Sequence, residues 1–347
     1  MTLPGGWMLG LVAASAIVLI GLERIRPYNS GQRLLRTGFF MDLLEYNFLQ
    51  SYVLGIVIAA LIARLDSAAG GVSRLRLVGG WPLGLQVAFF VVTHDLYIYL
   101  FHRLQHRSPL LWRIHQAHHS VAEVDWLSGA RSHALEILVN QTVEFAPIVL
   151  LGAAPEVAVW KGAISAIWGM FIHSNLDVRM GPLQYVFNGP EMHRWHHSVR
   201  PEAENRNFST KLAIWDWIFG TAFFPDPRRR KAAQYGIDDP DFPSGYLAQQ
   251  WYAFRRRLER PVAPPLEDIR RYSGKSGLGE SGWSQSFGSS SSSRASTASM
   301  DRSSGFGGVS CRTPRSSTWQ PSRRNASETR SAPCVRSTST SRPTSPT

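Results

Sequence analysis

The chain has 347 residues, enough for one large domain or two ordinary ones, and its formal net charge is +12. Ten basic and three acidic residues lie after residue 272, so this Ser/Arg-rich end carries seven of those twelve units. A nucleic-acid interface needs basic residues on a folded face together with aromatic side chains, and this distribution does not supply them. Both cysteines, Cys311 and Cys334, lie in the same end, which excludes a thiolate metal site, a disulfide framework and a redox pair.

Residues 1–101 are predicted to form N-terminal transmembrane helices. The continuous, mostly apolar run 7–22 is long enough to span a bilayer. The uncharged stretch 46–63 gives a second span, and 77–101 gives a third. Residues 137–175 then form two shorter apolar segments, which predict a membrane hairpin.

The two segments of this hairpin are 137–157 and 162–175, joined around Pro155 and Lys161. The charges of the loops predict which side of the membrane each loop faces, because cytoplasmic loops carry an excess of Lys and Arg. The loop after the first span has four arginines and the loop after the second has three. This small difference places the first loop, and everything after the third span, on the cytoplasmic side.

Histidines are the most informative residues of the chain. All eleven lie between His94 and His197. Imidazole is the commonest metal ligand among side chains, and nine at ligand spacing are more than one ion accepts, so a site with two metals is the first hypothesis. These nine form an HxxxH pair, two HxxHH boxes and one isolated position: His102, His106, His115, His118, His119, His173, His193, His196 and His197.

Helical spacing predicts how these rings are distributed. Residues four apart share a helix face, so His102 and His106 can reach one metal from one helix, and Asp95 lies on the same stripe. His94 points about 100° away and is expected to be packed rather than to bind metal. In each HxxHH box the first and last histidines share a face and the middle one points aside, so a box can offer ligands to two metals.

The ligand type does not identify the metal, because imidazole binds zinc, copper, iron and nickel. A structural zinc site usually includes cysteine, and a hydrolytic zinc pair usually has bridging carboxylates. Iron that activates O2 needs open coordination positions and a shielded pocket. An all-nitrogen shell at a membrane surface provides both.

From about Asp95 to Thr221 the chain resembles the fatty acid hydroxylase/sterol desaturase superfamily of integral membrane di-iron oxygenases. The motifs that carry the resemblance are DLYIYLFHRLQH, LWRIHQAHHS, RSHALE, HSN, HRWHHS and WDWIFGT. The resemblance implies a helical membrane bundle capped by a cytoplasmic metal domain, with two irons as cofactor and O2 as co-substrate. It implies that the irons are held by His102, His106, His115, His118, His119, His173, His193, His196 and His197.

Four further residues are expected to support catalysis: His133, Asp95, Glu136 and Asn175. His133 lies in a motif that usually reads RxHPxE, in which Ala134 here replaces proline. The other three are candidates because imidazole ligands usually donate their second N–H to a carboxylate or a carbonyl, although helix capping or pairing inside the membrane would also explain them. At the position of Asp177 some relatives have another histidine. Asp177 is therefore a candidate oxygen ligand or hydrogen-bond acceptor.

The expected function is O2-dependent hydroxylation or desaturation of a lipid taken from the bilayer. No flavin fingerprint, iron–sulfur cysteine set or cytochrome-like segment is found, so electrons are expected from a separate ferredoxin-like or cytochrome-like partner with its reductase. Two other function classes stay open. One is a non-catalytic metal-binding or metal-transporting membrane protein, and the other is a membrane metallohydrolase.

The expected fold is therefore all-α, a multi-pass membrane bundle of about three spans and a hairpin with a cytoplasmic His-box domain. The expected division is 1–101 for the N-terminal helices, 102–272 for the catalytic region and 273–347 for a disordered tail, because the last segment has too few apolar residues to bury a core.

Overall fold

A computed structural model describes residues 6–225 and 231–255. All regular elements in these residues are helical, which confirms the predicted fold class. The described residues contain no strand, only two isolated bridges, Pro27 with Leu176 and Ser198 with Tyr235. The expected tail, 273–347, lies outside the described residues.

Three helices are long and apolar enough to span a membrane: α1 (Gly6–Ile25), α2 (Ser51–Ala68) with the π-helical segment Met41–Gln50 that precedes it, and α3 (Leu83–Arg107). The three predicted spans are thus confirmed by length and composition. The third begins at Leu83 and not at residue 77, because Pro82 stands at its N-cap and the residue before a proline is disfavoured in a helix.

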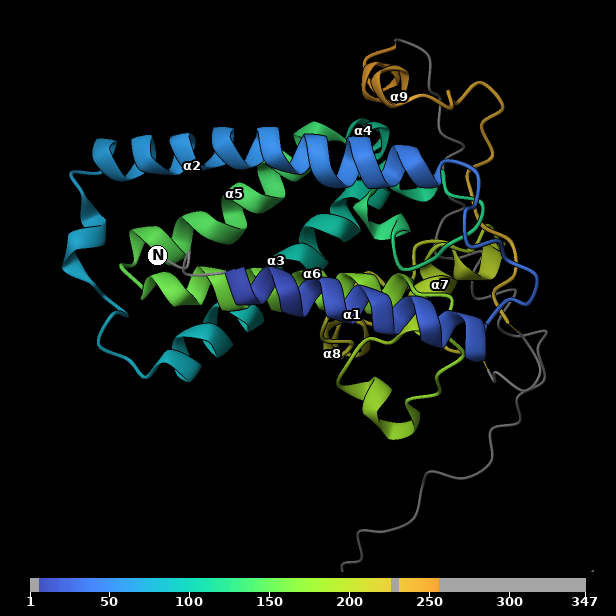
Figure 1. Ribbon diagram of the computed structural model, residues 1–347, viewed down its shortest axis with the longest axis horizontal. Coiled ribbons are helices and arrows are strands. Elements are labelled where there is room, and N and C mark those ends of the chain that lie inside the picture. The colour runs from blue at the N-terminus through green and yellow to red at the C-terminus, as the bar shows by residue number, and fades with distance from the viewer. Residues whose placement is uncertain (1–5, 226–230, 256–347) are drawn as a thin grey trace, which may run out of the picture. The chain divides into compact units, whose positions relative to one another are not determined.

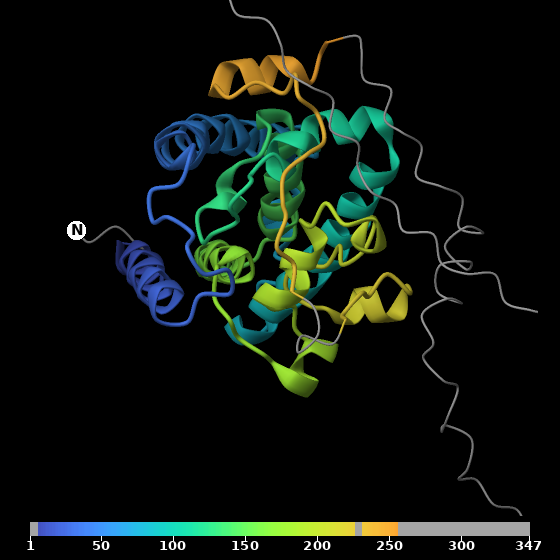
Figure 2. The same ribbon diagram turned by 90° about the vertical axis from the view of Figure 1, so that its right-hand side faces the viewer.

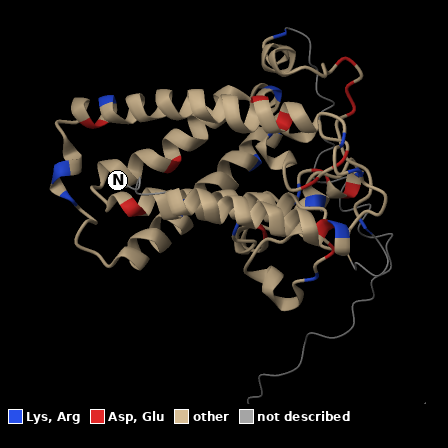
Figure 3. Cartoon of the chain, in the orientation of Figure 1, with Lys and Arg blue, Asp and Glu red and all other residues tan. Residues whose placement is uncertain are grey.

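The long helices expose apolar side chains to their surroundings. Leu9 and Ile17 on α1 are 75% and 70% exposed, and Tyr52 and Ile56 on α2 are 72% and 58% exposed. Charged residues gather at the helix ends and are sparse along the helix bodies (Figure 3). Large apolar surfaces of this kind mark contact with a membrane or a partner, and the helix lengths match a bilayer.

The predicted hairpin is formed by α5 (Ala134–Leu150) and α6 (Pro155–His173). α2 packs along α5, and α1 packs along α6 (Figure 1). The turn between them spans 151–154, earlier than the joint expected around Pro155 and Lys161. Gly152 takes a left-handed conformation there (φ 63°), Pro155 starts α6, and Lys161 lies buried inside that helix.

The HxxHH boxes lie on two short helices, α4 (Pro109–His119) and α7 (Pro190–His196). Ser108 caps α4 by accepting a hydrogen bond from Leu111 N, and Pro109 occupies its first position. Two more short helices follow, α8 (Ile214–Ile218) and α9 (Tyr246–Tyr252). Figure 2 looks at the bundle from the end where α4, α7 and α9 lie.

Buried ion pairs attach the first loop to the same end of the bundle. Arg36 binds Asp125 at 2.8 Å and Asp42 at 2.7 Å, and Arg131 binds Asp42 at 2.6 Å. The loop between α2 and α3 lies at the opposite end (Figure 1). The first loop and the His boxes therefore share one side of the bundle, as predicted.

Candidate metal centre

Nine buried histidines form two neighbouring groups in the part of the chain that the structure describes. Within each group the nearest ring nitrogens all lie within 4.8 Å of one another. The group of five contains His102, His106, His115, His119 and His196. The group of four contains His118, His173, His193 and His197. These are the nine ligands that the sequence predicts.

Helix geometry explains how the boxes divide. On α4, His115 and His119 are four residues apart and enter the group of five, whereas His118 turns into the group of four. On α7 the order is reversed, because His193 and His197 enter the group of four and His196 enters the group of five. Each box therefore contributes to both groups, as the spacing predicts.

Backbone carbonyls orient four of the rings. In each case the ring Nδ1 donates to a carbonyl oxygen, which leaves Nε2 directed toward the other histidines. The pairs are His102–Phe208 at 2.8 Å, His118–Arg131 at 3.1 Å, His173–Gly169 at 2.8 Å and His196–Arg206 at 2.8 Å. Such partners are the usual means by which proteins fix a metal-binding imidazole.

The resulting arrangement of nitrogens fits cations. A carbonyl only accepts, so Nδ1 of His118 and of His173 carries the hydrogen and each Nε2 presents a lone pair. These two Nε2 atoms are 3.3 Å apart, and those of His119 and His196 are 3.1 Å apart. Facing lone pairs repel each other, whereas two nitrogens about 2.1 Å from one ion at a right angle lie about 3 Å apart. A bound ion in each group would satisfy this geometry.

The protonation of the rings also suits metal binding. Burial, followed by the neighbouring charge of His115, lowers the pKa of His118 to about 4. Burial and the other histidines hold the pKa values of His119 and His197 well below 6.5. Protons compete with metals for imidazole, so rings that are neutral at neutral pH are ready to bind.

Glu136 is the one of the four expected supporting residues that contacts a histidine of the two groups. Its Oε1 accepts from His115 Nδ1 at 3.0 Å, and burial raises its pKa to about 7. Glu136 lies in the first turn of α5. This carboxylate orients His115 as the carbonyls orient the other rings.

Asp95 lies one step farther from the rings. Its Oδ1 accepts from Thr210 Oγ1 and Lys211 N, and its Oδ2 accepts from Leu212 N and Trp215 Nε1, at 2.8–3.1 Å. It thereby holds the segment that follows Phe208, whose carbonyl orients His102.

Asn175, His133 and Asp177 have their contacts outside the two groups. Asn175 Oδ1 accepts from Asn29 N at 2.9 Å, joining the first loop to the end of α6. His133 caps α5, accepting from Leu135 N with Nδ1, and its Nε2 lies 2.8 Å from Gln250 O. Asp177 accepts from Lys231 Nζ at 2.8 Å.

The sequence patterns do not identify Asp216, which holds the peptide whose carbonyl orients His102 in the group of five. The oxygens Oδ1 and Oδ2 of Asp216 accept from Phe208 N and Ser209 N, both at 2.9 Å, and this fixes the peptide that orients His102. Backbone partners leave no mark in a sequence, because every residue has a carbonyl. The WDW motif that contains Asp216 was the one available signal.

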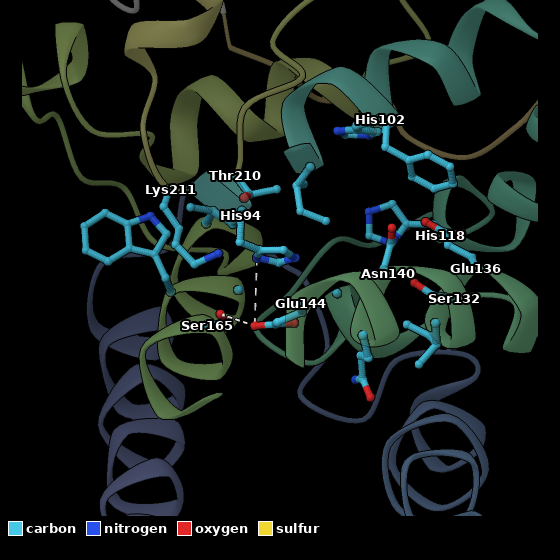
Figure 4. Close-up of a pocket in the computed structure, with 18 of the residues that line it drawn as sticks. His94, His102, His118, Ser132, Glu136, Asn140, Glu144, Ser165, Thr210 and Lys211 are labelled. Carbon is cyan, nitrogen blue, oxygen red and sulfur yellow. Dashed lines mark hydrogen bonds and ion pairs between the residues drawn. The ribbon is translucent and has the colours of Figure 1, made fainter. Parts of the chain in front are cut away.

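Two cavities reach the histidines. One, of about 260 Å³, lies between α3, α5 and α6 and touches both groups (Figure 4). Its lining includes Ile98, Phe101 and Ile137. The other, of about 410 Å³, is bounded by α4 and by loops at 198–205 and 236–239, and it reaches His106 and His119. The histidines are thus accessible both from among the long helices and from the loops at the end of the bundle.

The chain was compared with known proteins. Residues 87–221 match the fatty acid hydroxylase family. An ornithine lipid hydroxylase from Rhizobium tropici is 33% identical over 261 residues, covering 73% of this chain and 77% of that protein. Alkylglycerol monooxygenase from Danio rerio is 33% identical over 146 residues, covering 42% of this chain and 31% of that protein. Methylsterol monooxygenase 1 from Rattus norvegicus is 29% identical over 133 residues, covering 38% and 44%. No solved structure matches the chain.

Long apolar helices with nine clustered histidines at one end define a membrane protein with a candidate centre for two metals. The similarity to the hydroxylase from Rhizobium tropici extends over most of both chains, far beyond the His boxes. The chain belongs to the fatty acid hydroxylase family. The resemblance inferred from the motifs is therefore confirmed.

Proposed function

We propose that the protein is an O2-dependent lipid hydroxylase with two irons, one held by the group of five histidines and the other by the group of four. The observation that carries this proposal is the division of nine buried imidazoles into two adjoining groups. Four protein ligands leave open positions on an octahedral ion, as O2 chemistry requires. The names of the relatives, which are hydroxylases and monooxygenases, support the reaction class.

When bound, the irons supply the activation of O2 and the removal of hydrogen from an unactivated C–H bond. The chain supplies placement. Carbonyls and Glu136 fix the ring orientations, so the nitrogens need little reorganisation on binding metal. Hydroxylation and desaturation begin with the same hydrogen removal, and the relatives favour hydroxylation.

The substrate is proposed to enter from the bilayer. The cavity between α3, α5 and α6 combines apolar side chains such as Ile98 and Phe101 with direct access to His102 and His118. An extended lipid chain lying among these helices would bring a methylene group to the histidines while the helices exclude water.

Electrons are proposed to come from a separate ferredoxin-like or cytochrome-like protein with its reductase. The second cavity, among the loops beyond α4, reaches His106 and His119 and would give such a partner access to them. We also propose that this end faces the cytoplasm. Arg24, Arg26 and Arg33 in and beside the first loop support that orientation.

The test is to purify the protein in detergent from iron-replete cells and to measure metal content and product together. We expect about two irons per chain, because nine imidazoles exceed the coordination of one ion. Lipids incubated with reductant and isotopically heavy O2 should gain a labelled hydroxyl. A zinc protein that acts without O2 would establish a metallohydrolase instead, and bound metal with no product under any condition would favour metal binding or transport.

A further inference from the structure

The cavity between α3, α5 and α6 is not lined by apolar groups alone. His94, Glu144, Ser165 and Lys211 contribute polar atoms to its wall (Figure 4). Lys161, fully buried behind them, connects three of these groups. A cavity that accepts only a hydrocarbon chain has no need of this cluster, because each buried polar group costs desolvation energy.

The bonds of Lys161 determine which nitrogen of His94 carries the hydrogen. An ammonium group has three N–H donors and no acceptor. Lys161 Nζ contacts Glu144 Oε1, Ser165 Oγ at 3.4 Å and His94 Nδ1 at 2.6 Å. Because Nδ1 must accept from the ammonium group, Nε2 of the neutral ring carries the hydrogen.

This Nε2–H has no hydrogen-bond partner among the described residues, although the His94 side chain is only 7% exposed. An unsatisfied buried donor is unfavourable, which indicates that a ligand completes it. His94 belongs to neither group of clustered histidines, so a metal is not that ligand. The ring lines the cavity, where a bound molecule would meet it.

The charges around the ring indicate what kind of acceptor fits. Lys161 pairs with Glu144, and Lys211 Nζ lies 3.8 Å from Asp95 Oδ1. Among the described residues, both cations next to His94 therefore have a carboxylate beside them, and the nearest metal-group histidine on α3, His102, lies eight residues farther along the helix. A carboxylate or phosphate bound at His94 would have no adjacent counter-charge and so a high desolvation cost, whereas a neutral carbonyl oxygen would not.

We propose that His94 is a specificity-determining residue that donates from Nε2 to the carbonyl oxygen of an acyl ester or amide in the bound lipid. This rests on the proposed function. His94 and His102 are eight residues apart on α3, about 12 Å along the helix axis. Holding the carbonyl at His94 therefore selects which carbon of the chain lies at the metal groups.

Two substitutions separate the donor from the rest of the ring. His94→Asn keeps an oxygen near the position of Nδ1, where it can accept from Lys161, but has no donor that reaches the cavity. His94→Gln extends an amide N–H to about the position of Nε2. His94 belongs to neither metal group, so iron per chain should stay at the wild-type value in both variants.

Binding is measured on the protein as purified, without reductant so that no turnover occurs, by equilibrium dialysis in nonionic detergent with labelled methyl palmitate and labelled hexadecane as probes. Micelle partitioning is common to all variants and cancels in comparison with wild type. We expect His94→Asn to weaken ester binding about tenfold, the effect of one buried hydrogen bond, with hexadecane unchanged. His94→Gln should stay within about threefold for both probes.

Equal ester binding in wild type and His94→Asn, or an equal loss for both probes, would overturn the proposal. If His94→Asn fails to retain iron when loaded, the comparison moves to His94→Leu and His94→Gln, and equal ester binding in those two overturns it as well. Dialysis needs no turnover and uses the protein with whatever metal it carries on purification. A wild-type protein that carries no iron or oxidises no lipid would therefore refute the proposed function, while the difference in ester binding between wild type and His94→Asn would still test the assignment of His94.

Discussion

Two glycines lie next to the His173 ring in the group of four. The ring Nδ1 donates to Gly169 O at 2.8 Å, and the backbone at Gly129 lies close against the ring. A Cβ added at Gly129 would meet Nδ1 at 2.7 Å, closer than real Cβ contacts come. A Cβ added at Gly169 would meet nothing within 4 Å. The ring can therefore keep its place only while position 129 has no side chain.

These two glycines offer a matched test of the group of four. Gly129→Ala should push the His173 ring out of alignment and lower the affinity of this group for iron by about 10- to 100-fold, the usual effect of disturbing the support of a ligand. Gly169→Ala should leave affinity at the wild-type value. Titration of the metal-free variants with iron under anaerobic conditions measures both, and equal affinities would contradict the role of Gly129 in positioning His173.

Substitution of single histidines separates metal ligands from helix caps. His118→Ala and His196→Ala each remove one nitrogen from a different group, so both should lose product formation and much of the iron. His133→Asn should keep iron, because Asn also caps helices and His133 contacts neither group; the cost in stability is about 1 kcal/mol or less.

Iron per chain and product are measured for the three variants in the same membranes. Complete loss of iron in His133→Asn would add His133 to the ligand set, contrary to the structure.

At the scale of elements, α3 holds both the ligands and the loop that orients them. His102 and His106 occupy its last turns, and Asp95, two turns earlier, holds the backbone of 210–212. The loop in turn presents Phe208 O to His102. One helix therefore sets the position of two rings and of the backbone acceptor for one of them.

Asp95→Asn should loosen this connection, because an amide presents one acceptor oxygen where the carboxylate used two. Two of the four donors would then face an NH2 group. We expect a loss of about 2–3 kcal/mol, roughly 5–10 °C in Tm, together with weaker iron retention.

Asp66→Asn is the control, since the Asp66 carboxylate accepts from Ser73 N and Oγ at the end of α2, away from the histidines, and it should leave iron content unchanged. Thermal denaturation in detergent with parallel iron analysis gives both values. An Asp95→Asn protein with wild-type Tm and iron would contradict the role assigned to Asp95.

The features that the sequence predicts correctly are those that depend on local helical geometry. The periodicity of HxxHH assigned His118 and His196 to the opposite group from their neighbours, because helical spacing is local. Apolar runs identified the long helices for the same reason. The placement of Asn175 beside Asn29, and of His133 beside Gln250, depends on contacts between distant segments. No local pattern reports such contacts, so the motifs alone predict both residues at the site.

Four helices meet at the two metal groups. α3 and α4 enter the group of five, and α6 and α7 enter the group of four, while each HxxHH box contributes to both. Segments more than ninety positions apart in the sequence, such as those of His102 and His196, therefore place lone pairs against one another. Without a cation these nitrogens repel, so metal binding and the association of the helices are one process.

Removal of the metal should consequently destabilise the entire helical unit. An ion bound at a free concentration about 1,000-fold above its Kd stabilises the folded state by about 4 kcal/mol, so stripping two ions should lower Tm by more than about 10 °C. Thermal unfolding of iron-loaded and chelator-treated protein in the same detergent measures this shift. Zinc added to the stripped protein should restore Tm without restoring lipid oxidation, because zinc has no redox chemistry. The double variant His118→Ala/His196→Ala should show a much smaller chelator effect. If complete, verified removal of iron left the wild-type Tm unchanged, the nine histidines could not be joining the four helices through metal.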